Sequence, residues 1–120
     1  MVNQTVRLAV DLMINDGKLD AFEGIAQEMV EGSQKEPGTL GYEWFLSADR
    51  KKCRLIETYQ DGDAVLAHFN GPVVKVMVPK LLGTASLAGF EVYGDPGTKA
   101  REMVAGFGAE VFEFHRGLGR

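Results

Sequence analysis

Four side chains that could bind and deprotonate a flat ring occur in two neighbouring stretches of the sequence. Tyr42 and Trp44 alternate in EPGTLGYEWFLS, and Glu57 and Tyr59 alternate in RLIETY. Because alternate residues of a strand point to the same face, each pair is predicted to share one face of its strand. A buried carboxylate must be hydrogen-bonded, paired or protonated. The pattern indicates either a hydrogen bond that locks the strands together or a ligand pocket in which the pKa of Glu57 is raised.

The polar turn ADRKK between these stretches predicts an antiparallel hairpin. A turn centred between residues 49 and 50 places the aromatic and acidic side chains on one common face. The pairs predicted by this register are Trp44 with Leu55, Tyr42 with Glu57, and Leu40 with Tyr59.

His68 is the candidate proton acceptor. It follows Ala64 and Val65 by four and three residues, so the three side chains are predicted to share one face of a helix. Imidazole exchanges protons readily near neutral pH. Asn70 could donate a hydrogen bond into the same cavity, although its place before a Gly-Pro helix break explains it equally well. The candidate catalytic residues are therefore His68 and Glu57, and the candidate substrate-binding residues are Tyr42, Trp44, Tyr59 and Asn70.

Each candidate also has an ordinary structural interpretation. Aromatic side chains on one strand face are commonly core residues, and a single histidine on a helix is commonly exposed or satisfied by a hydrogen bond. Glu57 could serve only to accept a hydrogen bond within the hairpin.

Several classes of site are disfavoured by the composition. The chain has no CxxC, HxxxH or HExxH, and His68 and His115 are far apart, so no metal site is predicted. No GxGxxG follows a strand, and no cofactor is expected. A net charge of -4 over 120 residues argues against nucleic acid, and the sequence has no long apolar run for a membrane. Cys53 is the single cysteine, which suits a protein of the reducing cytoplasm.

Hydrophobic periodicity predicts strand, helix, strand, strand, helix, strand, followed by an appendix. The strands are expected at 5–14, 40–47, 53–59 and 84–93, and the helices from about 19 to 32 and from Asp61 to Phe69, with a short helical segment after the Gly-Pro break. This order is an α+β, ferredoxin-like βαββαβ plait, in which both helices cover one face of an antiparallel sheet. We predict one domain over 1–95 and an extension over 96–120 that packs on it or on a partner, with a short helix to about 104 and a strand at 110–115.

The second face of the sheet predicts a homodimer. The mixed apolar and charged side chains on it are Glu43, Phe45, Arg54, Ile56 and Thr58. In so short a chain, the readiest cover for such a face is a second copy of the same sheet.

Three stretches, EPGTLGYEWFLS (36–47), RLIETYQDGDAVLAHF (54–69) and EVYGDP (91–96), resemble the antibiotic biosynthesis monooxygenase family, which includes quinol monooxygenases. The resemblance covers roughly residues 5–95 and implies a dimeric α+β barrel whose helical histidine, here His68, looks toward the cavity. The family fold serves cofactor-free oxygenation of quinols and anthrones, haem degradation and isomerisation of small signalling sugars. It therefore implies the fold more strongly than the substrate.

The favoured function is cofactor-independent oxidation of a quinol, anthrone or similar phenolic ring by molecular oxygen. A deprotonated quinol is electron-rich enough to reduce oxygen directly, so the protein needs a base, a few hydrogen-bond donors and a dry pocket. His68 would be the base, and Glu57 would orient it or a water molecule.

Three alternatives are weighed against this function. Family members that degrade haem use an asparagine in the middle of the first strand, where this chain offers only Asn3 and Asn15 at the ends. Isomerisation of a small sugar would use Glu57 and His68 as proton carriers, but the aromatic face suits a phosphorylated substrate poorly. A non-catalytic dimeric module that binds a small ligand is the third alternative.

Overall fold

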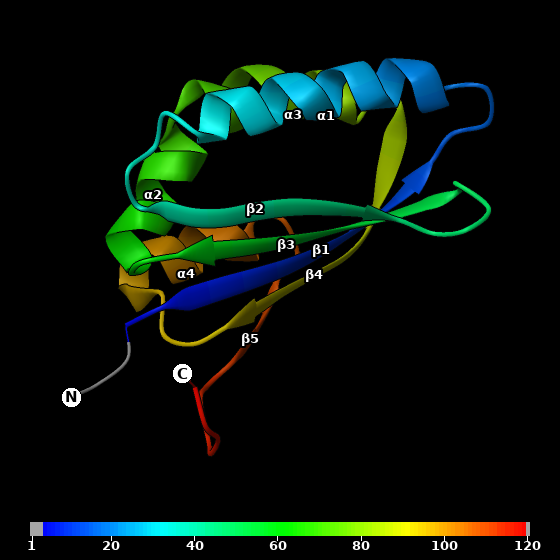
Figure 1. Cartoon of the computed structure of the whole chain (residues 1–120). Coiled ribbons are helices and arrows are strands. Elements are labelled where there is room, and N and C mark those ends of the chain that lie inside the picture. Colours follow the sequence, from blue (N-terminus) through cyan, green and yellow to red (C-terminus); the bar gives the residue numbers. More distant parts are fainter. Residues whose placement is uncertain (1–3, 120) are drawn as a thin grey trace.

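The computed structural model describes residues 4–119 (Figure 1). Asn3 and the first residues of the predicted domain lie outside this range. The strands are β1 (Val6–Ile14), β2 (Thr39–Leu46), β3 (Lys52–Tyr59), β4 (Ala85–Tyr93) and β5 (Glu110–Phe112). The helices are α1 (Leu19–Ser33), α2 (Gly62–Asn70), the π-helical turn η1 (Val73–Met77), α3 (Val78–Leu81) and α4 (Gly97–Ala105).

The described strands form a single sheet in the order β2-β3-β1-β4-β5. β1 pairs antiparallel with both β3 and β4, and β2 pairs antiparallel with β3, as the ferredoxin-like plait requires. The α+β fold predicted from the sequence is thereby confirmed. β5 adds to the β4 edge in parallel, so the complete sheet is mixed.

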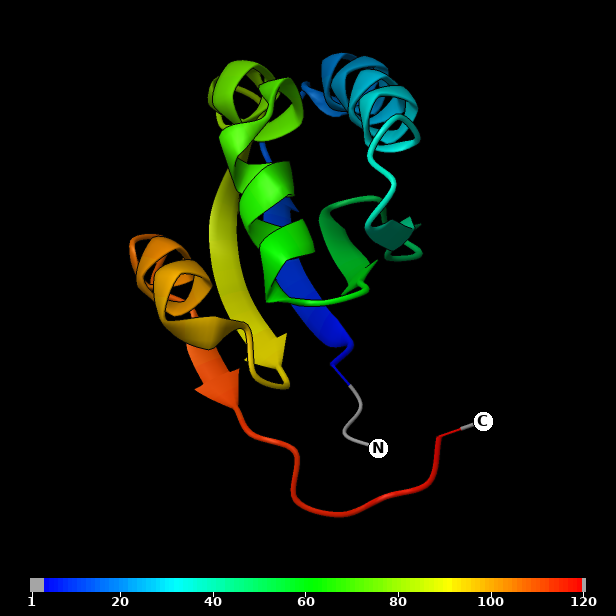
Figure 2. The ribbon, with the colours of Figure 1, turned by 90° about the vertical axis from the view of Figure 1, so that its left-hand side faces the viewer.

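The core lies between the sheet and the layer formed by α1, α2, η1 and α3, which Figures 1 and 2 show on one side of the strands. Val6, Leu8, Val10 and Leu12 alternate along β1 and are all buried, as their spacing predicts. In α1 the apolar positions Phe22 and Met29 face the same core. One face of the sheet is thus largely covered by the helices, while the other carries exposed apolar side chains such as Phe45.

Two β-bulges correct the predicted strand faces. Leu40 was predicted opposite Tyr59, but Thr39 takes that place and Leu40 is the extra residue, 60% exposed. In β4, the register shifts so that Leu87 pairs with Leu12 and Ala88 is exposed, although a strict alternation over the predicted strand 84–93 would put Ala88 on the same face as the buried Phe90. A bulge inserts one residue and reverses the alternation beyond it, which a period of two cannot reveal.

The start of α2 is fixed by Asp61, whose side chain accepts a hydrogen bond from the Ala64 amide at 2.9 Å. The helix ends where Gly71 and Pro72 follow, as predicted. The next segment is helical as expected, but begins with the π-helical turn η1 before α3. This bend carries the chain across the cavity side of the sheet toward β4.

α4 and β5 lie along the β4 edge in Figure 2, with α4 in orange and β5 below it, and the chain after β5 runs away from this edge. α4 buries Ala100 and Val104, and a side chain on Gly62 would collide with the Pro96 carbonyl oxygen, so the extension meets the start of α2 closely. The last strand was predicted over 110–115 but extends only from Glu110 to Phe112. Within residues 4–119, no helix has the length and apolar character needed to cross a membrane.

Candidate functional site

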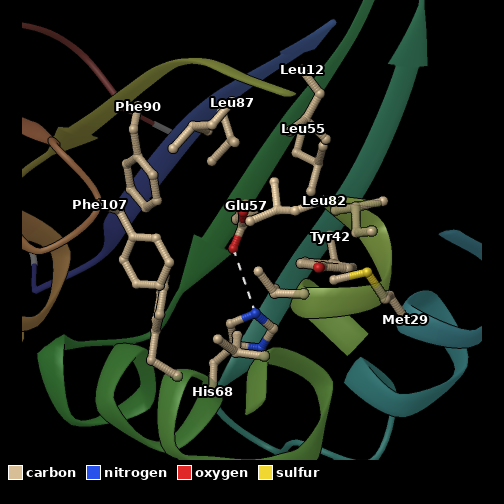
Figure 3. A pocket seen from close by; sticks show the side chains of 15 residues that line it. Leu12, Met29, Tyr42, Leu55, Glu57, His68, Leu82, Leu87, Phe90 and Phe107 are labelled. Atoms are coloured by element: carbon tan, nitrogen blue, oxygen red, sulfur yellow. Dashed lines mark ion pairs between the residues drawn. The ribbon is translucent and has the colours of Figure 1, made fainter. Parts of the chain in front are cut away.

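A cavity of about 60 Å³ lies between the sheet and the helices. Its lining is apolar except for three side chains, Tyr42, Glu57 and His68, which come from β2, β3 and α2. Figure 3 shows the Glu57 carboxylate and the His68 ring directed toward one another across this space. The apolar part of the lining consists of Val10, Leu12, Met29, Leu55, Phe69, Val74, Val78, Leu81, Leu82, Leu87, Phe90 and Phe107.

Glu57 is 4% exposed and lies opposite Tyr42 in the predicted register. The Tyr59 hydroxyl donates a hydrogen bond to Glu57 Oε1 at 2.5 Å. Burial raises the pKa of Glu57 above its ordinary value, although His68 and the Tyr59 hydroxyl oppose this effect. The two features that the sequence offered as alternatives for Glu57 therefore occur together. Glu57 accepts a hydrogen bond within the hairpin, and it also faces a cavity.

His68 is 1% exposed and lies one helical turn after Ala64 on the buried face of α2. Its Nε2 atom is 3.8 Å from Glu57 Oε1, and the rings of Tyr42 and Tyr59 pack at centroid distances of 5.3 and 5.4 Å. The imidazole is thus held by aromatic packing, with one nitrogen directed to the buried carboxylate.

Glu36 completes this arrangement and was not selected from the sequence. Its Oε1 atom is 2.7 Å from His68 Nδ1, on the side of the ring opposite Glu57. Thr39 donates its hydroxyl to the same oxygen at 2.9 Å. The place of Glu36 in the sequence, a carboxylate shortly before the aromatic strand, is the signal that could have found it.

Tyr42 lines the cavity, and burial together with the charge of Glu57 raises its pKa well above the ordinary value. Its hydroxyl therefore stays protonated and can donate a hydrogen bond. Trp44 was grouped with it but packs edge-on against Phe22 and Tyr42, outside the lining. Tyr59 reaches the site through its hydrogen bond to Glu57.

Asn70 is exposed at the end of α2 and is not among the cavity-lining residues. At about 100° per residue, a position two residues after His68 lies on the far side of the helix. The structure therefore brings His68, Glu57, Tyr42 and Tyr59 together and leaves Trp44 and Asn70 outside.

The mouth of the cavity is formed by Leu82 and Leu87, which line it while remaining 46% and 37% exposed. A cavity of about 150 Å³ holds benzene in another protein, so about 60 Å³ is too small for an aromatic ring. Binding of a ring therefore requires these leucines, or the η1–α3 segment beside them, to move outward. Among residues 4–119, no group of three His, Cys, Asp or Glu side chains is arranged to hold a metal ion.

The family model for antibiotic biosynthesis monooxygenases matches residues 5–80, more than half of the chain. The chain belongs to this family. Its members are monooxygenase-type proteins, and the match takes in β1, the hairpin and the helix that carries His68. No curated protein gives a significant match to the chain.

Solved structures share the fold. MupZ from Pseudomonas fluorescens is 24% identical with a TM-score of 0.88, over 98% of this chain and 96% of that one, a coverage that takes in the extension after residue 95. A conserved protein of unknown function from Bacteroides thetaiotaomicron is 25% identical, with a TM-score of 0.69 over 76% of this chain and 97% of its own. SnoaB from Streptomyces nogalater, a cofactor-independent oxygenase, is 14% identical, with a TM-score of 0.68 over 79% of this chain and 96% of its own.

Proposed function

We propose that this protein is a cofactor-independent monooxygenase that oxidises a quinol, anthrone or similar phenolic ring with molecular oxygen. The observation that carries the proposal is the direction of His68 Nε2 into an apolar cavity beside the buried carboxylate of Glu57. A base in a dry site is what the oxygen chemistry of such rings needs from a protein. The neighbour SnoaB, a cofactor-independent oxygenase, has the same fold.

In the proposed reaction, His68 Nε2 removes a proton from the ring substrate, and Tyr42 donates a hydrogen bond to the oxygen that becomes negatively charged. The anion passes an electron to oxygen, and the two radicals combine into a peroxide on the ring carbon. Breaking the O–O bond leaves one oxygen atom on that carbon as a carbonyl. The other leaves as water with two hydrogens from the substrate, so no external reductant is consumed.

Phe69, Phe90 and Phe107 contribute aromatic walls that suit a flat ring. Their role is to exclude water while the radical pair recombines. Because the cavity must enlarge to admit a ring, shortening Leu82 at the mouth is expected to lower KM for bulky anthrones more than for simple quinols.

A second candidate is an acid–base reaction without oxygen, such as isomerisation of a small substrate. It is favoured by the presence of two proton-transfer groups, Glu57 and His68, in a cavity smaller than an aromatic ring. The apolar lining argues against a phosphorylated sugar as its substrate.

The experiment that tests the proposal is oxygen consumption by purified protein stripped of metal and flavin, on a panel of quinols and anthrones with autoxidation subtracted. His68→Ala is the test variant, and His115→Ala is the matched control because His115 is exposed in the C-terminal tail. Uptake that falls about 10²–10⁴-fold in His68→Ala and is unchanged in His115→Ala is the expected result.

Absence of enzyme-dependent uptake on every ring would contradict the oxygenase proposal. Proton exchange into a substrate without oxygen uptake would then favour the acid–base candidate, and ring binding without either reaction would favour a binding module.

We also propose that the protein is a homodimer joined through the uncovered sheet face. That face carries Phe45 at 53% and Tyr93 at 42% exposure beside the charged Arg54, a mixture suited to a second copy of the sheet. Phe45→Glu is expected to give monomers by light scattering, whereas Leu118→Glu in the exposed tail is the control. An unchanged mass for Phe45→Glu would contradict this interface.

We propose further that residues 1–95 form the core domain and that 96–120 extend it on the same subunit. Support comes from the parallel pairing of β5 with β4 and from the packing of α4 through Ala100 and Val104. Deletion from residue 96 is expected to lower the melting temperature without changing the oligomeric state. Loss of the dimer on deletion would instead show that the extension contacts the partner.

A further inference from the structure

Glu36 has the geometry of a group that acts through His68. Its side chain is 17% exposed, and its Oε1 atom lies 2.7 Å from His68 Nδ1 and 2.9 Å from the Thr39 hydroxyl. A carboxylate of this kind can only accept hydrogen bonds, so both neighbours must donate to it. The proton of the neutral imidazole is therefore on Nδ1, and the lone pair is on Nε2.

The chain positions Glu36 by bringing its turn unusually close to α2. A side-chain carbon on Gly38 would lie 2.5 Å from Ala64 Cβ, so only glycine allows this approach. Ala64 precedes His68 by one helical turn on the same face. The Gly38 carbonyl oxygen also accepts a hydrogen bond from the Gln60 amide at 2.9 Å. The contact between Gly38 and Ala64 therefore fixes the distance from Glu36 to His68.

From this geometry we infer that Glu36 is a positioning residue, which holds His68 in the tautomer whose Nε2 lone pair faces the cavity. The inference rests on the proposed role of His68 as the base, and it deepens that role by naming what sets its orientation. Without Glu36, the ring could carry its proton on Nε2, and that nitrogen could not accept a proton from a substrate. With Glu36 ionised, the imidazolium formed by proton transfer has a carboxylate at Nδ1.

The charged and titratable groups around His68 come from several elements. Glu36 precedes β2, Tyr42 lies on β2, and Glu57 and Tyr59 lie on β3. Only Glu36 is within hydrogen-bond distance of an imidazole nitrogen, since Glu57 is 3.8 Å from Nε2. Removal of Glu36 should therefore change the tautomer while leaving the opposite side of the ring as it is.

The direct test is nitrogen-15 NMR of histidine-labelled full-length protein. The tautomer is read from the coupling pattern between the ring nitrogens and carbon-bound protons. The exposed His115 is the internal reference, identified with the His115→Ala variant. We expect a single Nδ1–H form for His68 in the native protein and in Glu28→Gln, which changes an exposed carboxylate of α1. Glu36→Ala should give mixed tautomers or the Nε2–H form.

Turnover supplies a second readout. Glu36→Ala should lower kcat about 10–100-fold, the range found for groups that orient a functional histidine, with a smaller change in KM. Glu36→Gln keeps an acceptor for Nδ1–H and should recover part of kcat.

An unchanged single Nδ1–H tautomer in folded Glu36→Ala would overturn the inference. Should Glu36→Ala not fold, Thr39→Val and Glu36→Gln decide, because a kcat that neither variant changes would also overturn it. Absence of turnover on every ring, with the tautomer shift present, would remove the oxygenase proposal and leave Glu36 as the group that orients His68.

Discussion

β3 takes part in two acid–base pairs on opposite faces of the sheet. They differ in the distance between acid and base, in burial, and in the direction in which the pKa of the carboxyl group is shifted. On the uncovered face, Arg54 donates two hydrogen bonds to Asp11 at 2.6 and 3.1 Å. On the cavity face, Glu57 and His68 are 3.8 Å apart and almost wholly buried. The Arg54 hydrogen bond, opposed by partial burial, lowers the pKa of Asp11, whereas burial raises that of Glu57.

The difference shows how distance and solvent decide what a carboxylate does. Asp11 has a cationic partner in contact with it and access to water, so its ionised form is favoured. Glu57 has no cation in contact and no access to water, so burial disfavours its ionised form and raises its pKa. Asp11 is therefore suited to joining two strands, whereas Glu57 has the perturbed pKa that is common at functional sites.

The largest expected effect is on turnover by Glu57→Gln. Glutamine keeps the shape and can still accept the Tyr59 hydrogen bond, but it lacks the carboxylate with which Glu57 would orient His68 or a water molecule. We expect kcat to fall about 10²-fold or more, while Glu28→Gln on the exposed side of α1 leaves it unchanged. Full activity in Glu57→Gln would show that the buried carboxylate serves only the hairpin.

The next effect concerns the pH dependence of stability. The folded pKa of Glu57 is raised above its ordinary value of 4.5, so the folded state binds more protons than the unfolded state above that pH. Its contribution to stability is therefore lost as pH rises from about 4.5 through the folded value. In melting experiments across this range, Glu57→Gln should gain stability over the native protein as pH increases. A difference between the two that is independent of pH would contradict a raised pKa.

Asp11→Asn should give a smaller effect of opposite sign. The folded pKa of Asp11 is lowered below its ordinary value of 3.8, so its stabilising contribution is present above that pH and is lost as pH falls through the folded value. Since Arg54 is largely exposed, we expect a small decrease in melting temperature at neutral pH. The decrease should shrink in high salt and disappear in acid. Persistence in both conditions would point to packing rather than charge.

Much of the fold could be predicted because its elements have a clear period. The alternation in β1, the three and four residue spacing in α1 and the Asp61 cap each reflect local physics, and each appears where expected. The bulges at Leu40 and Ala88 could not be predicted, since an inserted residue leaves no mark in the hydrophobic pattern.

Strand register and helix periodicity predict only the part of the candidate site that lies on regular strands and helices. Those rules place Tyr42, Glu57 and His68 on faces that meet. They could not place Glu36, because its contact with His68 depends on how closely the turn at Gly38 approaches α2. Asn70 is exposed and lies outside the cavity lining, because its angle around α2, which its amide chemistry does not reveal, turns it away from the face that carries His68.

The smallest expected effect is at Cys53, whose thiol is buried on the same face of β3 as Glu57 and Tyr59. Burial raises the pKa of its thiol to about 11, so the thiolate is scarce at neutral pH and also inaccessible. A thiol reagent at pH 8 should not react with the native protein, whereas the unfolded chain should react fully. Rapid reaction of the native protein would show that this face opens to water. That opening would weaken the contrast between the two faces, because Glu57 would share the access to solvent that Asp11 has.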